Sequence, residues 1–179
     1  MEIIGKKVVW QGKFMSAVEI TYRDARGVLR TWEALERLGI GGIVVMAAVT
    51  PSGNIILEKQ FRPPVGRDVL ELPAGLVEPG ESMEVAAKRE LIEETGWSAG
   101  KLEFLAEGPI STGASTEALR AYLCTDLDYV GKNGGEDNEI IEVPIQHAQE
   151  YLRTAQSTGT LIDLKVFGLV ELARQALGL

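Results

Sequence analysis

The sequence predicts a mixed α/β (α+β) fold, in which helices cover both faces of a mixed sheet. Residues 42–50 form a continuous apolar run bounded by glycines and Pro51, which is typical of a central strand buried on both faces. Shorter strand patterns alternate with helical patterns along the rest of the chain. The expected strands cover 55–61, 69–72, 102–107, 118–125 and 139–143, and the expected helices cover the stretch after Ser82, then 145–156 and 161–177.

The first 38 residues predict a separate antiparallel β-meander, with strands near 8–10, 14–22 and 28–33. A sheet of this size is too small to be stable alone. We therefore expect residues 1–38 to pack on the main domain, residues 39–179, or on another subunit.

A turn at residues 51–54 separates the run at 42–50 from the strand at 55–61. This arrangement predicts that the two strands form a hairpin. Pro63 ends the second strand, because proline cannot donate a hydrogen bond to a sheet.

Composition restricts the classes of function. The chain has 179 residues and a net charge of −8 without a basic stripe, which argues against a nucleic-acid partner. Cys124 is the only cysteine and His147 the only histidine, so an internal disulfide, a histidine-built zinc site and a Ser-His-Asp triad are not expected. No apolar segment reaches membrane-spanning length. We expect a cytoplasmic protein with no membrane partner.

The stretch from Gly75 to Trp97 predicts a helix with an acidic face. Ser82 is a suitable N-cap, Glu84 favours the helix dipole, and Gly96 supplies a C-terminal stop. Val85 and Ile92 are expected to supply the apolar surface that faces the core.

Three glutamates, Glu90, Glu93 and Glu94, fall within an arc of roughly 100° on this helix. The like charges of Glu90 and Glu94 oppose an isolated helix by roughly 0.2–0.5 kcal/mol. A divalent cation would turn this repulsion into coordination; the alternative is a solvated acidic face. Arg89 precedes Glu93 by one helical turn, so it can pair with that carboxylate.

The same stretch matches a known motif. Gly75 is followed by five residues and Glu81, and Glu81 is followed by seven residues and the sequence RELIEETGW at 89–97. This spacing fits the Nudix box, GX5EX7REUXEEXGU, at every fixed position. The chain therefore resembles the Nudix hydrolases. This resemblance implies an α/β/α sandwich and cleavage of a nucleoside diphosphate linked to another moiety.

Four further blocks resemble the ADP-ribose pyrophosphatases: 31–33 with Arg37, 59–64, 71–76 and 139–143. This resemblance implies hydrolysis of the pyrophosphate bond of ADP-ribose, or of a related nucleoside diphosphate sugar, to a nucleoside monophosphate and a sugar phosphate. Hydrolysis of GDP-mannose, or of many nucleoside diphosphate sugars, is the alternative. A non-catalytic nucleotide-sugar-binding module is more remote, because the box is intact.

The resemblance also implies the catalytic residues. Magnesium, or manganese, would be held by the Ala74 carbonyl, Glu90, Glu93 and Glu94. Glu81 and Arg89 would support this set. The expected general base is Glu139, with Glu136 and Glu117 as alternatives.

Substrate contacts follow from the same resemblance. Arg62 would grip a phosphate and Trp32 would stack on the base, and the remaining contacts would come from Glu33, Arg37, Phe14 and Gly113. Thr112 replaces the proline that usually precedes this glycine in ADP-ribose pyrophosphatases, which weakens the prediction of ADP-ribose as substrate. The resemblance further implies a homodimer in which the N-terminal sheet is shared between subunits.

Overall fold

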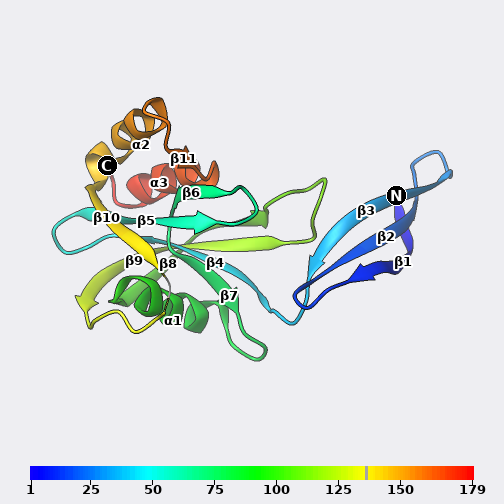
Figure 1. The fold of residues 1–179 in the computed structure, drawn as a ribbon, viewed down its shortest axis with the longest axis horizontal. Helices are drawn as coiled ribbons and strands as arrows, with labels where there is room; N and C mark the ends of the chain where they lie inside the picture. Colours follow the sequence, from blue (N-terminus) through cyan, green and yellow to red (C-terminus); the bar gives the residue numbers. More distant parts are fainter. Residues whose placement is uncertain (136) are drawn as a thin grey trace.

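The computed structural model describes residues 1–135 and 137–179. Glu136, one alternative for the general base, lies outside the described residues. The described chain forms three sheets and three α-helices, and the first sheet projects from the rest of the molecule (Figure 1).

The projecting sheet is the predicted antiparallel meander. Its strands β1 (Glu2–Gln11), β2 (Met15–Arg23) and β3 (Leu29–Arg37) pair in the order β1-β2-β3, and the first and third are longer than expected. A large share of its apolar surface is exposed, including Val8, Trp10 and Trp32 at 50%, 60% and 50%.

Two mixed four-stranded sheets form the main body. One has the order β7-β4-β9-β8, and the other has the order β10-β5-β6-β11. Their bounds are β4 (Gly42–Ala48), β5 (Asn54–Arg62), β6 (Arg67–Glu71), β7 (Ala74–Val77), β8 (Trp97–Pro109), β9 (Ala118–Tyr129), β10 (Asn138–Pro144) and β11 (Leu161–Ile162).

The predicted hairpin between the strands at 42–50 and 55–61 is wrong. β4 pairs antiparallel with β7 and parallel with β9, so both of its edges are occupied. β5 pairs instead with β6 and β10 in the other sheet. Only one isolated bridge, between Val49 and Ile55, joins the two segments. The turn lets the chain cross from one sheet to the other.

Helices cover both sides of the body, as predicted for a sandwich (Figure 1). Val44 and Met46 of β4 belong to a core that includes Leu91 of α1 (Met83–Thr95). Val45 belongs to a second core with Val166 of α3 (Lys165–Ala176). Alternate residues of β4 therefore face opposite layers, and the strand is buried on both faces.

The C-terminal patterns contain more breaks than expected. The expected helix at 145–156 is a short 3₁₀ turn, Ile145–His147, followed by α2 (Ala148–Ser157). The expected helix at 161–177 begins with β11, which pairs parallel with β6, and α3 starts only at Lys165. No helix in the described part of the chain is long and apolar enough to cross a membrane.

Candidate active site

Helix α1 is held at both ends by the expected caps. The Ser82 hydroxyl accepts a hydrogen bond from the Val85 N–H at 3.2 Å, and Gly96 adopts a left-handed φ of 80°. Its buried apolar face consists of Ala86, Ala87 and Leu91. Val85 is 57% exposed, so the prediction that it faces the core is wrong; the small alanines bring α1 close to the sheet instead.

Glu90 and Glu94 point from α1 toward β7. Their carboxylates accept hydrogen bonds from the backbone N–H groups of Leu76 at 3.1 Å and Ala74 at 3.0 Å. A Cβ atom on Gly75 would lie 1.9 Å from Cδ of Glu90. The first glycine of the motif is therefore needed because the glutamate side chain occupies the space beside its backbone.

Arg89 connects the carboxylates of the motif. Its guanidinium donates to both oxygens of Glu81 at 2.9 Å, to Glu93 at 3.1 Å and to the Leu76 carbonyl at 3.0 Å. It also lies 2.9 Å from Glu90. The hydrogen bond from Arg89 lowers the pKa of Glu81, and the same bond raises the pKa of Arg89. Burial raises the pKa of Glu90, although Arg89 opposes this shift.

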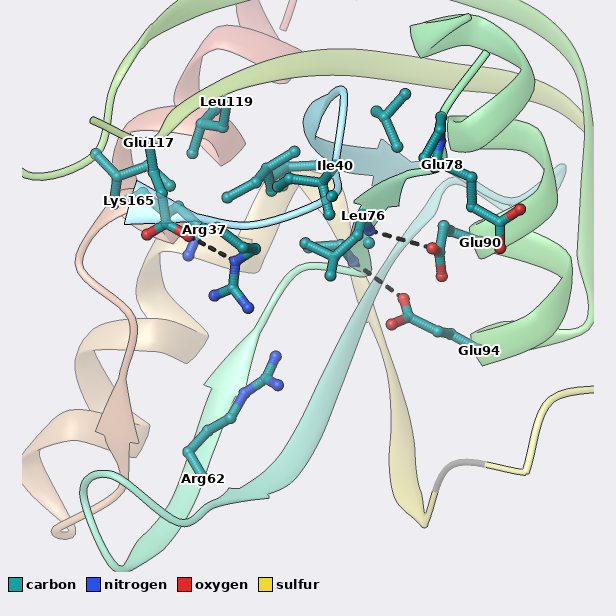
Figure 2. A pocket seen from close by; sticks show the side chains of 18 residues that line it. Arg37, Ile40, Arg62, Leu76, Glu78, Glu90, Glu94, Glu117, Leu119 and Lys165 are labelled. Atoms are coloured by element: carbon teal, nitrogen blue, oxygen red, sulfur yellow. Dashed lines mark hydrogen bonds and ion pairs between the residues drawn. The ribbon is translucent and has the colours of Figure 1, made fainter. Parts of the chain in front are cut away.

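A cavity of about 790 Å³ opens beside these carboxylates. This volume falls in the range of small-molecule sites. One side, here called the acidic wall, consists of Ala74, Gly75, Glu90 and Glu94. Three cations also line the cavity and are here called the basic wall: Arg37, Arg62 and Lys165. Figure 2 shows Arg37 and Lys165 across the cavity from Glu90 and Glu94, and Arg62 pointing toward the space between.

The cations of the basic wall are each paired with a carboxylate. Arg37 Nε donates to Glu117 at 2.7 Å, and Glu117 lines the cavity too. Arg62 donates through Nε at 2.8 Å, and also through Nη2, to one oxygen of the buried Glu71. Burial is the largest single influence on the pKa of Arg62 and lowers it, but the bond to Glu71 and the negative charges of nearby glutamates together raise this pKa above its ordinary value.

The acidic wall fits a magnesium-like ion in part. No group of three or more His, Cys, Asp or Glu side chains among the described residues is arranged to hold a metal. Glu93 pairs with Arg89 and is not among the residues lining the cavity. Magnesium, however, commonly takes only one or two carboxylates and completes its shell with water and substrate phosphates. Glu90 and Glu94 on one cavity wall meet that requirement.

Two of the predicted substrate residues meet outside the cavity. The indole Nε1 of Trp32 donates to the Gly113 carbonyl at 2.9 Å, which joins β3 to the loop after β8. Phe14 is 62% exposed beneath Lys13, and Glu33 lies opposite Glu19 on the N-terminal sheet. None of these residues is among those lining the cavity.

Glu139 lies on β10 with an exposed carboxylate 3.2 Å from Lys59. It does not line the cavity, whereas the alternative base Glu117 does.

Lys165 was not predicted as a site residue. No short-range pattern in the sequence identifies it, because it belongs to a C-terminal helix far from the motif.

The chain is similar to known proteins over most of its length. The model of the NUDIX domain matches residues 41–163. An uncharacterized Nudix hydrolase of Schizosaccharomyces pombe is 32% identical over 170 residues, which cover 86% of this chain and 82% of that protein. An ADP-ribose pyrophosphatase of Bacillus subtilis is 38% identical over 117 residues, which cover 65% of this chain and 63% of that protein.

The chain spans less than two thirds of the length of several curated relatives and about half of two of them. A solved structure of an ADP compounds hydrolase superposes with a TM-score of 0.82 at 21% identity, covering 98% of this chain and 93% of that one. This superposition shows a shared fold. The domain match over residues 41–163 and the 32% identity to the Schizosaccharomyces pombe protein establish that the chain belongs to the Nudix family.

Proposed function

We propose that this protein is a metal-dependent hydrolase of the pyrophosphate bond in ADP-ribose or a related nucleoside diphosphate sugar. The products would be a nucleoside monophosphate and a sugar phosphate. The observation that carries the proposal is one cavity whose lining includes two glutamates of the Nudix motif on one side and three cations elsewhere. Such a cavity suits a diphosphate bound together with a cation.

The two walls have different tasks in this proposal. Glu90 and Glu94, with the Ala74 carbonyl, would hold magnesium or manganese, which would offset the negative charge of the phosphate oxygens. Glu93 would join this set if the metal took the place of its ion pair with Arg89. Arg89 and Glu81 keep the carboxylates oriented, as the hydrogen bonds between them support. Arg62 would bind a phosphate through the donors that Glu71 leaves available.

We propose Glu139 as the general base, at the start of β10. Its exposed carboxylate would have to exchange Lys59 for the attacking water when substrate binds. Glu117 already lines the cavity, but its pairing with Arg37 ties it to the basic wall. Comparing Glu139→Gln with Glu117→Gln separates these candidates, because loss of the base lowers kcat and removes the acidic limb of its pH profile.

The base of the nucleotide would be bound by the N-terminal sheet. Trp32, Phe14, Glu33 and Arg37 are the proposed contacts, and the bond from Trp32 to Gly113 places the loop after β8 beside them. The exposed apolar side chains of this sheet support a homodimer in which a second copy covers them. The proposed dimer brings the two N-terminal sheets together. A cytoplasmic location remains a prediction.

A substrate panel tests this proposal. ADP-ribose, GDP-mannose, UDP-glucose, NADH and diadenosine polyphosphates should be offered with magnesium and the products identified. We expect ADP-ribose to give AMP and ribose 5-phosphate at the highest kcat/KM. Preference for GDP-mannose would select the alternative substrate, which stays open because Thr112 replaces the proline usual in ADP-ribose pyrophosphatases. A wide preference for dinucleoside polyphosphates would contradict the proposed substrate class. Binding without turnover of any compound would favour a binding module.

A further inference from the structure

Lys165 is the first residue of α3 and lines the same cavity as Glu90 and Glu94. Its backbone position is determined by buried neighbours. The preceding strand β11 pairs with β6, the Asp163 N–H donates to the Leu70 carbonyl at 3.0 Å, and Val166 is fully buried. The fold therefore fixes where this lysine leaves the backbone, although its side chain is long and flexible.

Lys165 and Arg62 have the same arrangement of charge. Each cation lines the cavity, and each pairs with a carboxylate that is not among the residues lining it: Asp163 for Lys165 and Glu71 for Arg62. Glu71 and Asp163 come directly after Leu70 and Ile162, which pair between β6 and β11, so the two acidic residues are neighbours across these strands. Both also line a neighbouring hollow of about 390 Å³. The two ion pairs thus form one group at the ends of β6 and β11, with their positive ends reaching the cavity.

The third cation, Arg37, is arranged differently. Its partner Glu117 lines the main cavity, so this pair brings a negative charge to the cavity together with the positive one. In a chain with a net charge of −8, few groups can offset the charge of an anionic ligand. Arg62 and Lys165 are the two cations of the basic wall whose partner carboxylates do not line the cavity.

We propose that Lys165 is a substrate-binding residue that acts with Arg62 to hold the diphosphate of the substrate on the side opposite the acidic wall. This inference rests on the proposed function of the cavity and adds a contact to it. An ammonium group suits this task, because it has three donors and binds phosphate as a compact charge. Asp163 would keep the side chain near the cavity until the substrate binds.

Kinetics of Lys165→Met tests this proposal, because methionine keeps an unbranched stem and removes the charge. We expect KM for the best substrate to rise about tenfold or more, with a smaller change in kcat. Lys165→Arg should restore KM to within about threefold, because it returns the positive charge. Lys101→Met is the matched control: Lys101 also pairs with a carboxylate, Glu103 at 3.3 Å, but lies outside the cavity.

Direct binding gives a second readout that does not need turnover. The dissociation constant of an α,β-methylene analogue of ADP-ribose should be measured with magnesium for the wild type and each variant. Lys165→Met should weaken binding about as much as it raises KM, and its thermal midpoint should match that of Lys101→Met. Unchanged KM and unchanged analogue affinity in Lys165→Met would overturn the assignment.

Two other outcomes separate this inference from the proposed function. An active wild type with an indifferent Lys165→Met variant rejects only the role of Lys165. A wild type that hydrolyses nothing, but binds the analogue through Lys165, rejects the hydrolase and keeps the contact. Inhibition constants of AMP, ribose 5-phosphate and free ribose, measured for the wild type and for Lys165→Met, test whether the lysine contacts phosphate. We expect the variant to bind the two phosphate compounds more weakly and free ribose equally well. A change for free ribose alone would overturn the phosphate assignment.

Discussion

The two walls of the cavity are built in different ways. The acidic wall comes from one local unit, in which β7 and α1 lie within the 23-residue motif region and its flank and contact each other directly. The basic wall takes one residue each from β3, β5 and α3, three segments that are distant in the chain. The difference indicates that the proposed cation-binding part of the site is encoded locally, whereas the phosphate-binding cations and the proposed base Glu139 on β10 depend on the assembly of the whole fold.

This comparison predicts opposite kinetic effects. Changes to the acidic wall should lower kcat, because they act on the charge that stabilises the transition state. Changes to the basic wall should mainly raise KM, because they remove contacts made by both the bound substrate and the transition state.

Glu94→Gln should give the largest effect. The glutamine can still accept the Ala74 N–H bond at 3.0 Å, so we expect an intact fold. The variant lacks the negative charge proposed to hold the cation, and kcat should fall by about a hundredfold or more. Steady-state kinetics over a magnesium titration, with circular dichroism as the folding control, checks this. Near-normal activity would remove the argument for a metal at the acidic wall.

Gly75→Ala should give the next largest effect. The new methyl group would meet Cδ of Glu90 at 1.9 Å and would push this carboxylate out of place. We expect kcat to fall by about tenfold to a hundredfold, because misplaced ligating groups lose affinity and activity on this scale. Gly5→Ala is the control, since a Cβ at Gly5 would meet nothing within 4 Å. Equal activity of the two variants would show that the close approach is not needed.

Arg62→Lys tests the basic wall. Lysine keeps the charge but lacks the planar guanidinium, whose several donors bond Glu71 and reach the cavity at the same time. We expect KM to rise about tenfold and kcat to change less. A fall in kcat as large as that of Glu94→Gln, with KM unchanged, would contradict the division of tasks between the walls.

The smallest expected effect concerns stability and pH. The hydrogen bond from Arg89 lowers the pKa of Glu81 below its ordinary value of 4.5. Glu81 therefore stabilises the fold at pH values above 4.5, and this contribution is lost as pH falls through its lowered pKa. The thermal midpoint of the wild type should exceed that of Glu81→Gln at pH 7, and the difference should shrink as the pH falls below 4.5 toward the lowered pKa of Glu81. A difference that does not change with pH would contradict this linkage.

Local chemistry made much of the acidic wall predictable. Ser82 and Gly96 set the ends of α1, and both caps are confirmed by their hydrogen bonds and dihedral angles. The spacing of Glu90 and Glu94 placed both on one side of the helix, where both line the cavity. The core-facing role of Val85 could not be decided from the sequence, because the orientation of α1 depends on which small residues meet the sheet.

Long-range pairing was predicted less well. The turn at residues 51–54 suggested a hairpin, but the neighbours of β4 are β7 and β9 and those of β5 are β6 and β10. A turn fixes only the local change of direction of the chain. Which strand edges then meet depends on the burial of side chains from the whole domain.

The sequence by itself determined the fold class, the acidic helix and the family motif, because caps, periodicity and fixed spacings act over a few residues. The tertiary structure alone decided that Arg37, Arg62 and Lys165 line the cavity with Glu90 and Glu94. It also decided that Trp32 bonds Gly113 and that Glu139 lies beside Lys59. These contacts join segments that are far apart along the chain, so no short sequence pattern indicates them. They form only once the sheets have paired.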